Sequence, residues 1–432
     1  MNSRGKNILV LSYVVSPYRG SEASVAWNYI TEMSKEHHLT VLYGCGGLHL
    51  GDNDDMERWL AEKSMPNVDF VFVKPNSLSR ILNWPNRKGF FPMCYHLAYR
   101  AWHRTVYNVA RELVAERHFD LIHYLGSSGY SQQGYLWKLD LPYMRGPMGG
   151  FNIAPDSMLS ELPALQRLRW KFRNWHIRKD LKRNDFLAEA VRCTDVIIGA
   201  TSENARVIKR HFGKDCDYMP ENCMRNPGYI CNDRFEAPGE LNIMMAGRLD
   251  ANKNNILLLQ AISRMTHADK VHVDFVGDGP MRPALERYIA DNKLGNIVTI
   301  RGMMPRDKVQ ELFDNAHLHV VTSVSEGNPT VVWEAMEHGV PTLTLDHCGM
   351  ADVVDEKSGV KISIGTSEEM SAAIAVALDA LVETPERLKQ LSEGTIERST
   401  IYQWDERRRK FNQYYDQTIA NYNNRLKTHP HC

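Results

Sequence analysis

The order of apolar segments in the second half of the chain constrains the possible folds more than any other feature of the sequence. A strand-like run, 241–246, is followed by a segment with apolar residues at helical spacing, 255–265, and then by another strand-like run, 271–276. The same alternation continues through 283–289, 297–300, 308–313, 318–322, 329–338, 342–345 and 367–381. Strands that alternate with helices in this way predict parallel βαβ units and a doubly wound α/β sheet.

The first half of the chain follows the same order less regularly. Strands are expected at 8–15, 40–43, 68–73, 121–124 and 196–199, and helices at 21–34, 95–116 and 204–211. Between the halves, 220–240 is rich in Pro and Gly and is the best candidate for a linker. We therefore predict two Rossmann-like domains, 1–220 and 221–404, whose ligands bind at the carboxyl ends of the strands.

Composition narrows the class of protein. The 432 residues carry 52 basic and 52 acidic side chains, so the formal net charge is zero. This balance argues against a protein that grips nucleic acid with its whole surface. No apolar run reaches the ~18 residues of a membrane-spanning helix. The eight cysteines form no C-x-x-C pair, which argues against a disulfide framework or a zinc site. We therefore expect a cytoplasmic protein.

The segment 325–330 follows one of the expected strands and opens a helix. Asn328 suits the N-cap position and Pro329 the first helical position, followed by Thr330. Backbone N–H groups at such a helix start form a site for anions. A well-capped helix without a ligand explains this segment alone equally well.

Two glutamates accompany this helix start. Glu334 lies inside the apolar run 331–336, so its carboxylate is expected to be only partly solvated and to need a partner. A ligand hydroxyl is one such partner, and a salt bridge is the alternative. Glu326, eight residues earlier in the preceding loop, is expected to face the same crevice.

A pair of cations follows another expected strand. Arg248 comes directly after Gly247, and Lys253 lies five residues beyond Arg248. Two cations at the carboxyl end of a strand suit a diphosphate, whereas surface salt bridges are the structural alternative. No strand-end turn matches G-x-G-x-x-G or the Walker pattern, so a nicotinamide-dependent or ATP-hydrolysing enzyme lacks its motif.

In their order along the chain, these segments resemble the retaining glycosyltransferase family 4 (glycosyl transferases group 1), whose members have the GT-B fold of two Rossmann-like domains facing a cleft. The segments that carry the resemblance are 246–249 with Lys253, 276–280, Glu326 and Glu334 with Gly327 and Pro329, 339–341, and, before the linker, Gly20-Ser21-Glu22, 120–123, 146–150 and 219–222. The resemblance covers the chain from about residue 8 to Trp404.

The resemblance implies roles for individual residues. Arg248 and Lys253 would hold the donor's diphosphate, Glu326 would contact the donor sugar, and Glu334 would bind the ribose. The loop at Gly20 would lie near the phosphates and the reacting sugar. The other positions implied for the donor site are Gly247, Gly327, Asn328, Pro329 and Thr330.

His123 is a further candidate for catalysis. Members of the family often carry a second histidine two residues beyond the one matching His123, and this chain has Leu125 there. A catalytic His123 and a buried histidine at the end of a strand therefore remain alternatives.

The resemblance implies an enzyme that moves a hexose-type sugar from a nucleotide diphosphate sugar to a glycan or lipid-linked glycan, with retention of anomeric configuration, in the synthesis of cell-surface polysaccharide. No cofactor and no metal are expected. Two alternatives remain: a GT-B nucleotide-sugar epimerase or hydrolase, and a catalytically silent subunit that binds a glycan or a partner enzyme. The identity of the nucleotide, the sugar, the acceptor and the linkage is left open.

Two acidic triplets suggest a metal-dependent alternative. Asp52-Asn53-Asp54 and Asp215-Cys216-Asp217 both spell D-x-D, which other glycosyltransferases use to hold a divalent cation. Neither follows a strong strand at a crevice, and we interpret both as solvated turns.

Two further segments have expected surfaces of their own. The segment 166–183 is rich in Lys and Arg with interleaved aromatic residues, which suits peripheral contact with an anionic membrane on its cytoplasmic face. A helix whose aromatics pack inward is the alternative. The last helix, 405–425, is expected to pack back on the N-terminal domain, as the resemblance implies.

Overall fold

The computed structural model describes residues 5–20, 22–88, 94–160, 162–236 and 239–428. The chain divides into two compact units. Unit 1 comprises Met1–Phe151, Asp180–Glu221 and Arg408–Cys432, and unit 2 comprises Asn152–Lys179 and Asn222–Arg407. Ser21 and Pro238, which belong to the resemblance and to the expected linker, lie outside the described residues.

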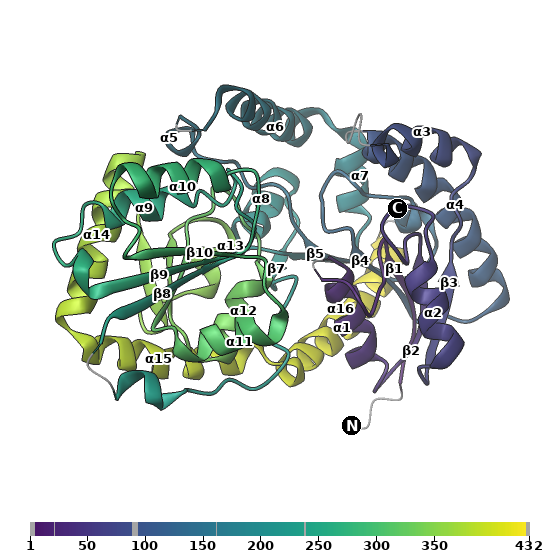
Figure 1. Cartoon of the computed structure of the whole chain (residues 1–432). Coiled ribbons are helices and arrows are strands. Elements are labelled where there is room, and N and C mark those ends of the chain that lie inside the picture. The colour runs from purple at the N-terminus through teal and green to yellow at the C-terminus, as the bar shows by residue number, and fades with distance from the viewer. Residues whose placement is uncertain (1–4, 21, 89–93, 161, 237–238, 429–432) are drawn as a thin grey trace. The chain divides into compact units, whose positions relative to one another are not determined.

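Unit 1 is built on a seven-stranded sheet in the order β3-β2-β1-β4-β5-β6-β7 (Figure 1). The strands are β1 (Asn7–Ser12), β2 (His38–Tyr43), β3 (Val68–Phe72), β4 (Leu121–Gly126), β5 (Tyr143–Met148), β6 (Val196–Gly199) and β7 (Cys216–Tyr218). All neighbouring strands are parallel. The central strands β1 and β4 are buried over almost their whole length, as parallel strands covered by helices on both faces must be.

The helices of unit 1 connect these strands. They are α1 (Glu22–Met33), α2 (Asp54–Glu62), α3 (Ser77–Arg87), α4 (Cys94–Glu116), α7 (Asp185–Arg192) and α8 (Ser202–Phe212). Side-chain caps fix several helix starts, because Asn76, Asn184 and Thr201 accept hydrogen bonds from backbone N–H groups of the first turns of α3, α7 and α8.

The C-terminal helix α16 (Trp404–Thr428) packs in unit 1 from Arg408 onward. Arg408 forms an ion pair of 2.6 Å with Glu32 of α1, and the hydroxyls of Tyr415 and Tyr29 lie 2.5 Å apart. Farther along, Arg425 lies 2.9 Å from Asp195, just before β6. These contacts tie the end of the chain to elements formed near its beginning.

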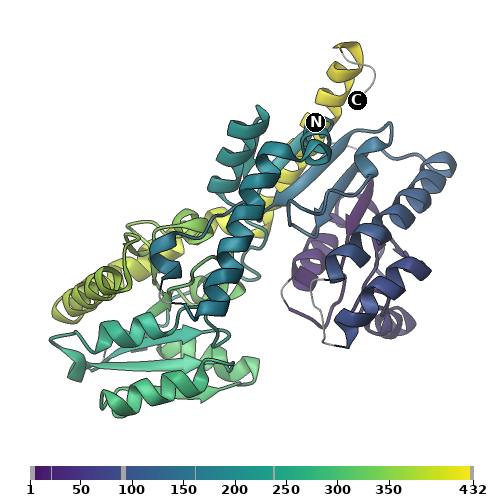
Figure 2. The same cartoon turned by 90° about the horizontal axis from the view of Figure 1, so that it is seen from above.

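Unit 2 has a six-stranded parallel sheet in the order β10-β9-β8-β11-β12-β13, with helices on both faces (Figures 1 and 2). Its strands are β8 (Leu241–Ala246), β9 (Val271–Val276), β10 (Val298–Gly302), β11 (Leu318–Val321), β12 (Thr342–Leu345) and β13 (Gly359–Ile362). Its helices are α5 (Asp156–Leu159), α6 (Ala164–Arg183, up to Lys179), α9 (Ile256–Ile262), α10 (Arg282–Asp291), α11 (Arg306–Asn315), α12 (Thr330–Glu337), α13 (Cys348–Val353), α14 (Ser367–Glu383) and α15 (Pro385–Ser399). The predicted architecture of two doubly wound parallel sheets is confirmed.

The strand order of each sheet indicates where a crevice for a ligand is expected. In unit 2 the chain runs outward from β8 through β9 to β10, then returns to β11 on the other side of β8 and runs through β12 to β13. The order therefore reverses between β8 and β11, and loops that leave adjacent strands in opposite directions open a crevice there. In unit 1 the corresponding point lies between β1 and β4.

The sequence predicts that 152–179 belongs to the N-terminal domain, whereas in the structure this segment belongs to unit 2. Met158, Leu159 and Leu162 belong to the same hydrophobic core as Leu257 and Ile262 of α9. Apolar burial against unit 2 therefore decides where this segment packs, although it lies before β6 in the chain.

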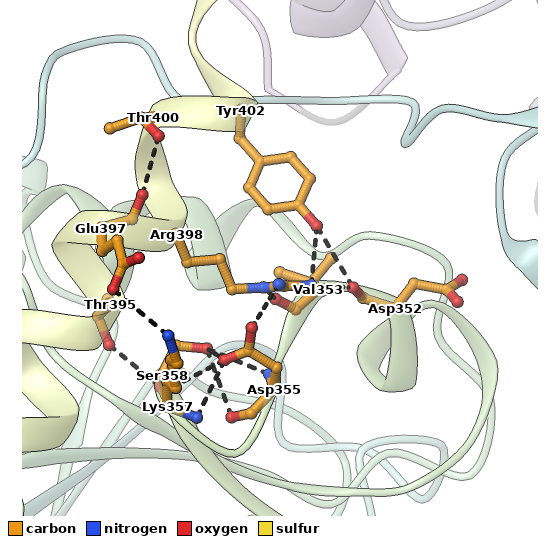
Figure 3. A network of polar contacts seen from close by, with 10 residues as sticks. All are labelled: Asp352, Val353, Asp355, Lys357, Ser358, Thr395, Glu397, Arg398, Thr400 and Tyr402. Carbon is orange, nitrogen blue, oxygen red and sulfur yellow. Dashed lines mark hydrogen bonds and ion pairs between the residues drawn. The ribbon is translucent and has the colours of Figure 1, made fainter.

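A polar network holds α15 to the loop between α13 and β13 (Figure 3). Arg398 donates hydrogen bonds to the carbonyls of Val353 and Asp352, the latter at 2.7 Å, and forms an ion pair of 2.5 Å with Asp355. Asp355 also accepts bonds from the backbone N–H and hydroxyl of Ser358, at 3.0 and 2.8 Å. One guanidinium thus satisfies the backbone carbonyls at the end of α13.

Candidate functional site

The candidate site of unit 2 lies at the switch point between β8 and β11. The loops after these strands are joined through their backbones, since Val324 donates to the carbonyl of Asn252 at 2.7 Å. The hydroxyl of Thr322 also donates to the carbonyls of Lys253 and Asn254, at 3.0 Å each. Side chains carried by the two loops are therefore held close together.

An ion pair crosses the switch point. The Nζ of Lys253 lies 2.5 Å from Oε2 of Glu326, and the two side chains are 23% and 19% exposed. Asp250 shapes the first loop by accepting the backbone N–H groups of Asn252 and Lys253, at 3.0 and 3.1 Å. This Asx-type turn aims Lys253 across the crevice.

Arg248 is held much more loosely than Lys253. Its side chain is 71% exposed, and its Nε lies 3.5 Å from the carboxylate of Asp250. Gly247, directly before it, has a φ of +134°, which favours glycine and turns the chain at the end of β8. An exposed guanidinium at this position is available to an anion that enters the crevice.

The helix α12 presents its N-terminus to the same place. Pro329 is the N-cap, with extended backbone, and as a proline it supplies no side-chain cap. The prediction that Asn328 is the N-cap and Pro329 the first helical residue is therefore wrong by one position, because the helix begins at Thr330. A helix start without a side-chain cap leaves backbone N–H groups for a ligand.

A pocket joins these features. Its lining residues come from β8, the loop after it, β11 and the start of α12, and they are Met245, Ala246, Arg248, Lys253, Asn255, Val320, Val321, Ser323, Pro329 and Val331. Among the described residues that line it are two cations and no carboxylate. The pocket therefore favours a negatively charged ligand.

Glu334 lies one turn inside α12 and is largely buried, as its apolar neighbours predict. Burial raises the pKa of Glu334, and the positive charges of Arg306 and Arg225 oppose that shift. Arg306, the first residue of α11, lies 3.4 Å from its carboxylate. Sequence reasoning missed Arg306, because its separation of 28 residues from Glu334 carries no local signal.

Two further predicted donor-site residues, Gly327 and Asn328, lie in the loop before α12, and Thr330 is the first residue of that helix. Gly327 and Asn328 separate Glu326 from Pro329, and Glu326 accepts the backbone N–H of Gly349 at 3.1 Å. The backbone of Gly349 lies so close that a Cβ there would meet the carbonyl oxygen of Gly327 at 1.5 Å. This contact with α13 supports the loop from behind.

His319 is a buried histidine beneath the crevice that sequence reasoning also missed. It lies in β11 with no exposed surface, and its Nδ1 is 3.3 Å from the hydroxyl of Thr342. Burial, together with the charge of Lys253, lowers the pKa of His319 to about 3. The imidazole is therefore neutral and adds no charge beneath the pocket.

Unit 1 has a pocket at its own switch point. It is lined by Ser12, Tyr13, Val14, Glu22, Val25, Ala26, Leu125, Gly126, Ser127, Ser128, Pro147 and Glu221. Gly20 is exposed two residues before α1, with open space where a Cβ would project. Desolvation by the surrounding protein atoms raises the pKa of the Glu22 carboxyl, although part of this residue is exposed to solvent.

His123 lies within β4 and is 0% exposed. Its Nδ1 is 2.9 Å from the hydroxyl of Tyr29 and 3.2 Å from that of Tyr415, and its Nε2 is 2.8 Å from the carbonyl of Gly146. The structure thus matches the alternative of a buried strand histidine. Both ring nitrogens of His123 therefore have partners within unit 1, and its side chain is fully buried.

The two D-x-D triplets lie in different elements of unit 1. Asp52 is paired with Arg87 at 3.0 Å, and Asp54 opens α2. Asp217 lies inside β7, so its interpretation as part of a turn is wrong. Among the described residues, no group of three or more His, Cys, Asp or Glu side chains is arranged to hold a metal ion.

Comparisons with known proteins agree with this geometry. Residues 240–380 match the family described as glycosyl transferases group 1. This stretch contains β8 to β13 and every residue of the unit 2 pocket.

Curated relatives are similar over part of their length. A D-inositol 3-phosphate glycosyltransferase of Nocardia farcinica is 26% identical over 246 residues, which is 53% of this chain and 53% of that protein. An amylovoran biosynthesis glycosyltransferase, AmsK of Erwinia amylovora, is 26% identical over 106 residues, 23% of this chain and 26% of that protein. The chain thus spans about half, or less, of the length of these relatives.

Solved structures share the fold over nearly the whole chain. The Anabaena protein Alr3699/HepE, crystallised in complex with UDP and glucose, is 15% identical with a TM-score of 0.61. The match covers 95% of this chain and 99% of that one. The fold is GT-B.

Proposed function

We propose that this protein is a glycosyltransferase that moves a sugar from a nucleotide diphosphate sugar to a glycan or lipid-linked glycan. The observation that carries the proposal is the Lys253–Glu326 pair, which joins the two loops of the switch point beside Arg248 and the N-terminus of α12. The same pocket lies entirely within residues 240–380, which match glycosyl transferases group 1.

The proposed chemistry follows from the charges in the pocket. Breaking the anomeric carbon–oxygen bond places negative charge on the departing diphosphate. Arg248, Lys253 and the N–H groups of α12 would already be in position to stabilise that charge as it develops, without a metal. Glu326 would accept hydrogen bonds from the donor sugar's hydroxyls, and Glu334 from those of the ribose.

Two finer features of the proposal come from the resemblance and the relatives. Retention of anomeric configuration is proposed because the ordered motifs resemble a retaining family. A role in cell-surface polysaccharide synthesis is proposed because relatives such as the amylovoran biosynthesis glycosyltransferase are described in that way. UDP is the nucleotide to test first, since the Anabaena structure contains UDP.

A panel of UDP-, GDP- and ADP-sugars in thermal-shift and calorimetric titrations tests the donor site. A donor present at about 100 times its dissociation constant should stabilise the fold by about 2.7 kcal/mol. Release of free nucleotide is then measured with and without candidate acceptors. Release that needs an acceptor supports transfer, release without one identifies a hydrolase or epimerase, and the absence of binding to every donor overturns the proposal.

A further inference from the structure

The helix α6 has two apolar faces that lie half a turn apart. On one face, Ile177 is buried and Trp170 packs against the core of unit 2. On the same side, the side chain of Asn174 accepts the N–H of Ala154 at 3.2 Å and donates to its carbonyl at 2.9 Å. This face anchors the helix to the protein.

The other apolar face of α6 is more than half exposed. It consists of Leu165, Leu168, Phe172 and Trp175, which we call the α6 stripe, and these are 61%, 65%, 53% and 52% exposed. Their spacing of three, four and three residues places them along one side of a helix. Four large apolar side chains exposed in a row mark a surface that meets another apolar phase.

Cations border the α6 stripe on both sides. Arg169 lies to one side of it, and Lys171 and Arg178 lie to the other, all exposed. The ammonium of Lys179 lies over the ring of Trp175, 5.2 Å from its centroid. The segment 164–179 contains no Asp or Glu, so nothing on it balances these charges.

We propose that the α6 stripe binds the surface of a lipid bilayer that contains anionic lipids. Leucine and aromatic side chains on one side of a helix insert at the boundary between headgroups and acyl chains, while bordering Lys and Arg side chains reach phosphate groups. Each such cation contributes about fivefold to partition onto an anionic surface. A protein partner would need an apolar groove with acidic walls on both sides, which is a more specialised requirement.

The contact is peripheral. Among the described helices, none combines the length and the apolar character needed to cross a bilayer. The helix α6 itself has charged residues all along its length and is fixed to unit 2 by its opposite face. It would therefore lie in the plane of the interface.

Vesicle flotation tests the proposal with the full chain and without donor or acceptor, so its result does not depend on the proposed enzymatic function. Vesicles of phosphatidylcholine alone are compared with vesicles that contain phosphatidylglycerol. We expect partition onto the anionic vesicles to exceed partition onto the neutral ones by at least about tenfold, and to fall as salt is added.

Variants locate the contact. The double variant Phe172→Ser and Trp175→Ser should lose at least about tenfold in partition, because it removes two apolar side chains from the face that would insert. Both side chains are already exposed, so their removal should leave the core intact. Val376→Ser, which removes an apolar side chain that is 70% exposed on α14, is the matched control and should bind like the wild type. Unchanged melting temperatures verify that both variants fold.

A second pair of substitutions tests the charges. Lys171→Glu with Arg178→Glu should abolish the preference for anionic vesicles. The proposal is overturned if the wild type binds neither vesicle or binds both equally, if the α6 variants bind like the wild type, or if Val376→Ser loses as much binding. Light scattering tests whether the α6 stripe binds a second copy of the chain instead. If the wild type is a dimer that binds no vesicles, and the stripe variant is a monomer, the surface is a dimer interface and the proposal is overturned.

Discussion

The Nζ of Lys253 lies 2.5 Å from Oε2 of Glu326, so the loop after β8 and the loop after β11 are joined by opposite charges 73 residues apart in the chain. In a doubly wound sheet these two loops border the crevice at which the strand order reverses. The pair therefore holds a cation and an acceptor of hydrogen bonds at fixed positions in the candidate site before any ligand enters.

Lys253→Ala should weaken the binding of UDP by at least about tenfold, because a charge-assisted contact to a phosphate contributes about 1.5–3 kcal/mol. Isothermal titration calorimetry measures the change directly. Lys308→Ala is the matched control, since Lys308 is an exposed lysine of the same unit that pairs with Glu311 on its own helix. Equal affinities of wild type and Lys253→Ala would remove Lys253 from the phosphate site.

Glu326→Gln should change the affinity for the UDP-sugar and leave the affinity for UDP nearly unchanged. The substitution removes the partner of Lys253 without removing the cation, so the affinity for UDP should stay within a few fold of the wild type or increase. The affinity for the preferred UDP-sugar should fall by about tenfold, because a carboxylate accepts hydroxyl hydrogen bonds more strongly than an amide. Titrations of UDP and of the UDP-sugar with the same protein give the two values. A parallel loss for both ligands would mean that Glu326 only positions Lys253.

Glu334→Gln should stabilise the ligand-free protein at neutral pH. Burial raises the pKa of Glu334 in the folded chain, so ionisation is disfavoured there relative to the unfolded chain, in which a glutamate titrates near ~4.3. Below that pH both states hold the proton and the wild type loses nothing. As the pH rises through the folded pKa, the wild type loses stability that the glutamine variant keeps.

Thermal unfolding of both proteins from pH 4 to pH 8 checks this prediction. The difference in melting temperature should be small at the acid end and should grow in favour of the variant towards neutrality. The same variant should bind the nucleotide more weakly, since an amide replaces the carboxylate proposed for the ribose. A constant difference across the range would show that Arg306, 3.4 Å away, compensates fully for burial.

Arg398→Ala should destabilise unit 2 by about 1–3 kcal/mol, because it leaves the carbonyl of Val353 without its donor and Asp355 without its cation (Figure 3). The carbonyl of Asp352 loses the guanidinium but keeps the hydroxyl of Tyr402, at 3.3 Å. Chemical denaturation measures the loss. Arg387→Ala serves as the control on the same helix, since Arg387 is exposed and donates to the backbone carbonyl of Glu356 at 2.9 Å and to Oε1 of Gln390 at 3.4 Å. Similar losses for both arginines would contradict a special role for Arg398.

The parts of the site that follow directly from strand and loop order could be predicted from the sequence. Alternating apolar runs predict a parallel sheet, and residues directly after β8 and β11 must then lie at one edge of it. This reasoning places Arg248, Lys253 and Glu326 together without knowledge of any contact. It also predicts the partial burial of Glu334 from its apolar neighbours.

The parts that depend on packing between distant segments could not be predicted. Arg306 faces Glu334 because α11 packs beside α12, which no local pattern encodes. On α6 the periodicity is ambiguous, since Trp170 and Phe172 are both aromatic, but Trp170 packs against the core and Phe172 is exposed. Only the position of the core relative to the helix decides which apolar face is buried.

Gly349→Ala should displace the loop that carries Glu326 in the candidate site. A Cβ at Gly349 would lie 1.5 Å from the carbonyl oxygen of Gly327 and 2.5 Å from its carbonyl carbon, so the backbone of the loop that carries Glu326 must move. That shift would also break the hydrogen bond from Gly349 to the carbonyl of Glu326, now 3.1 Å, and would lengthen the Lys253–Glu326 pair. We expect a loss of at least about tenfold in affinity for the UDP-sugar, because misplaced groups forfeit their contacts with a bound ligand.

Gly295→Ala is the matched control, since no atom lies within 4 Å of a Cβ built there. It should leave ligand affinity unchanged and stability equal or slightly higher, because alanine restricts the unfolded chain more than glycine does. Calorimetry of both variants, with melting temperatures measured in parallel, separates a local effect on the site from global unfolding. If Gly349→Ala binds the UDP-sugar as tightly as Gly295→Ala does, the support that α13 gives to the Glu326 loop has no part in donor binding.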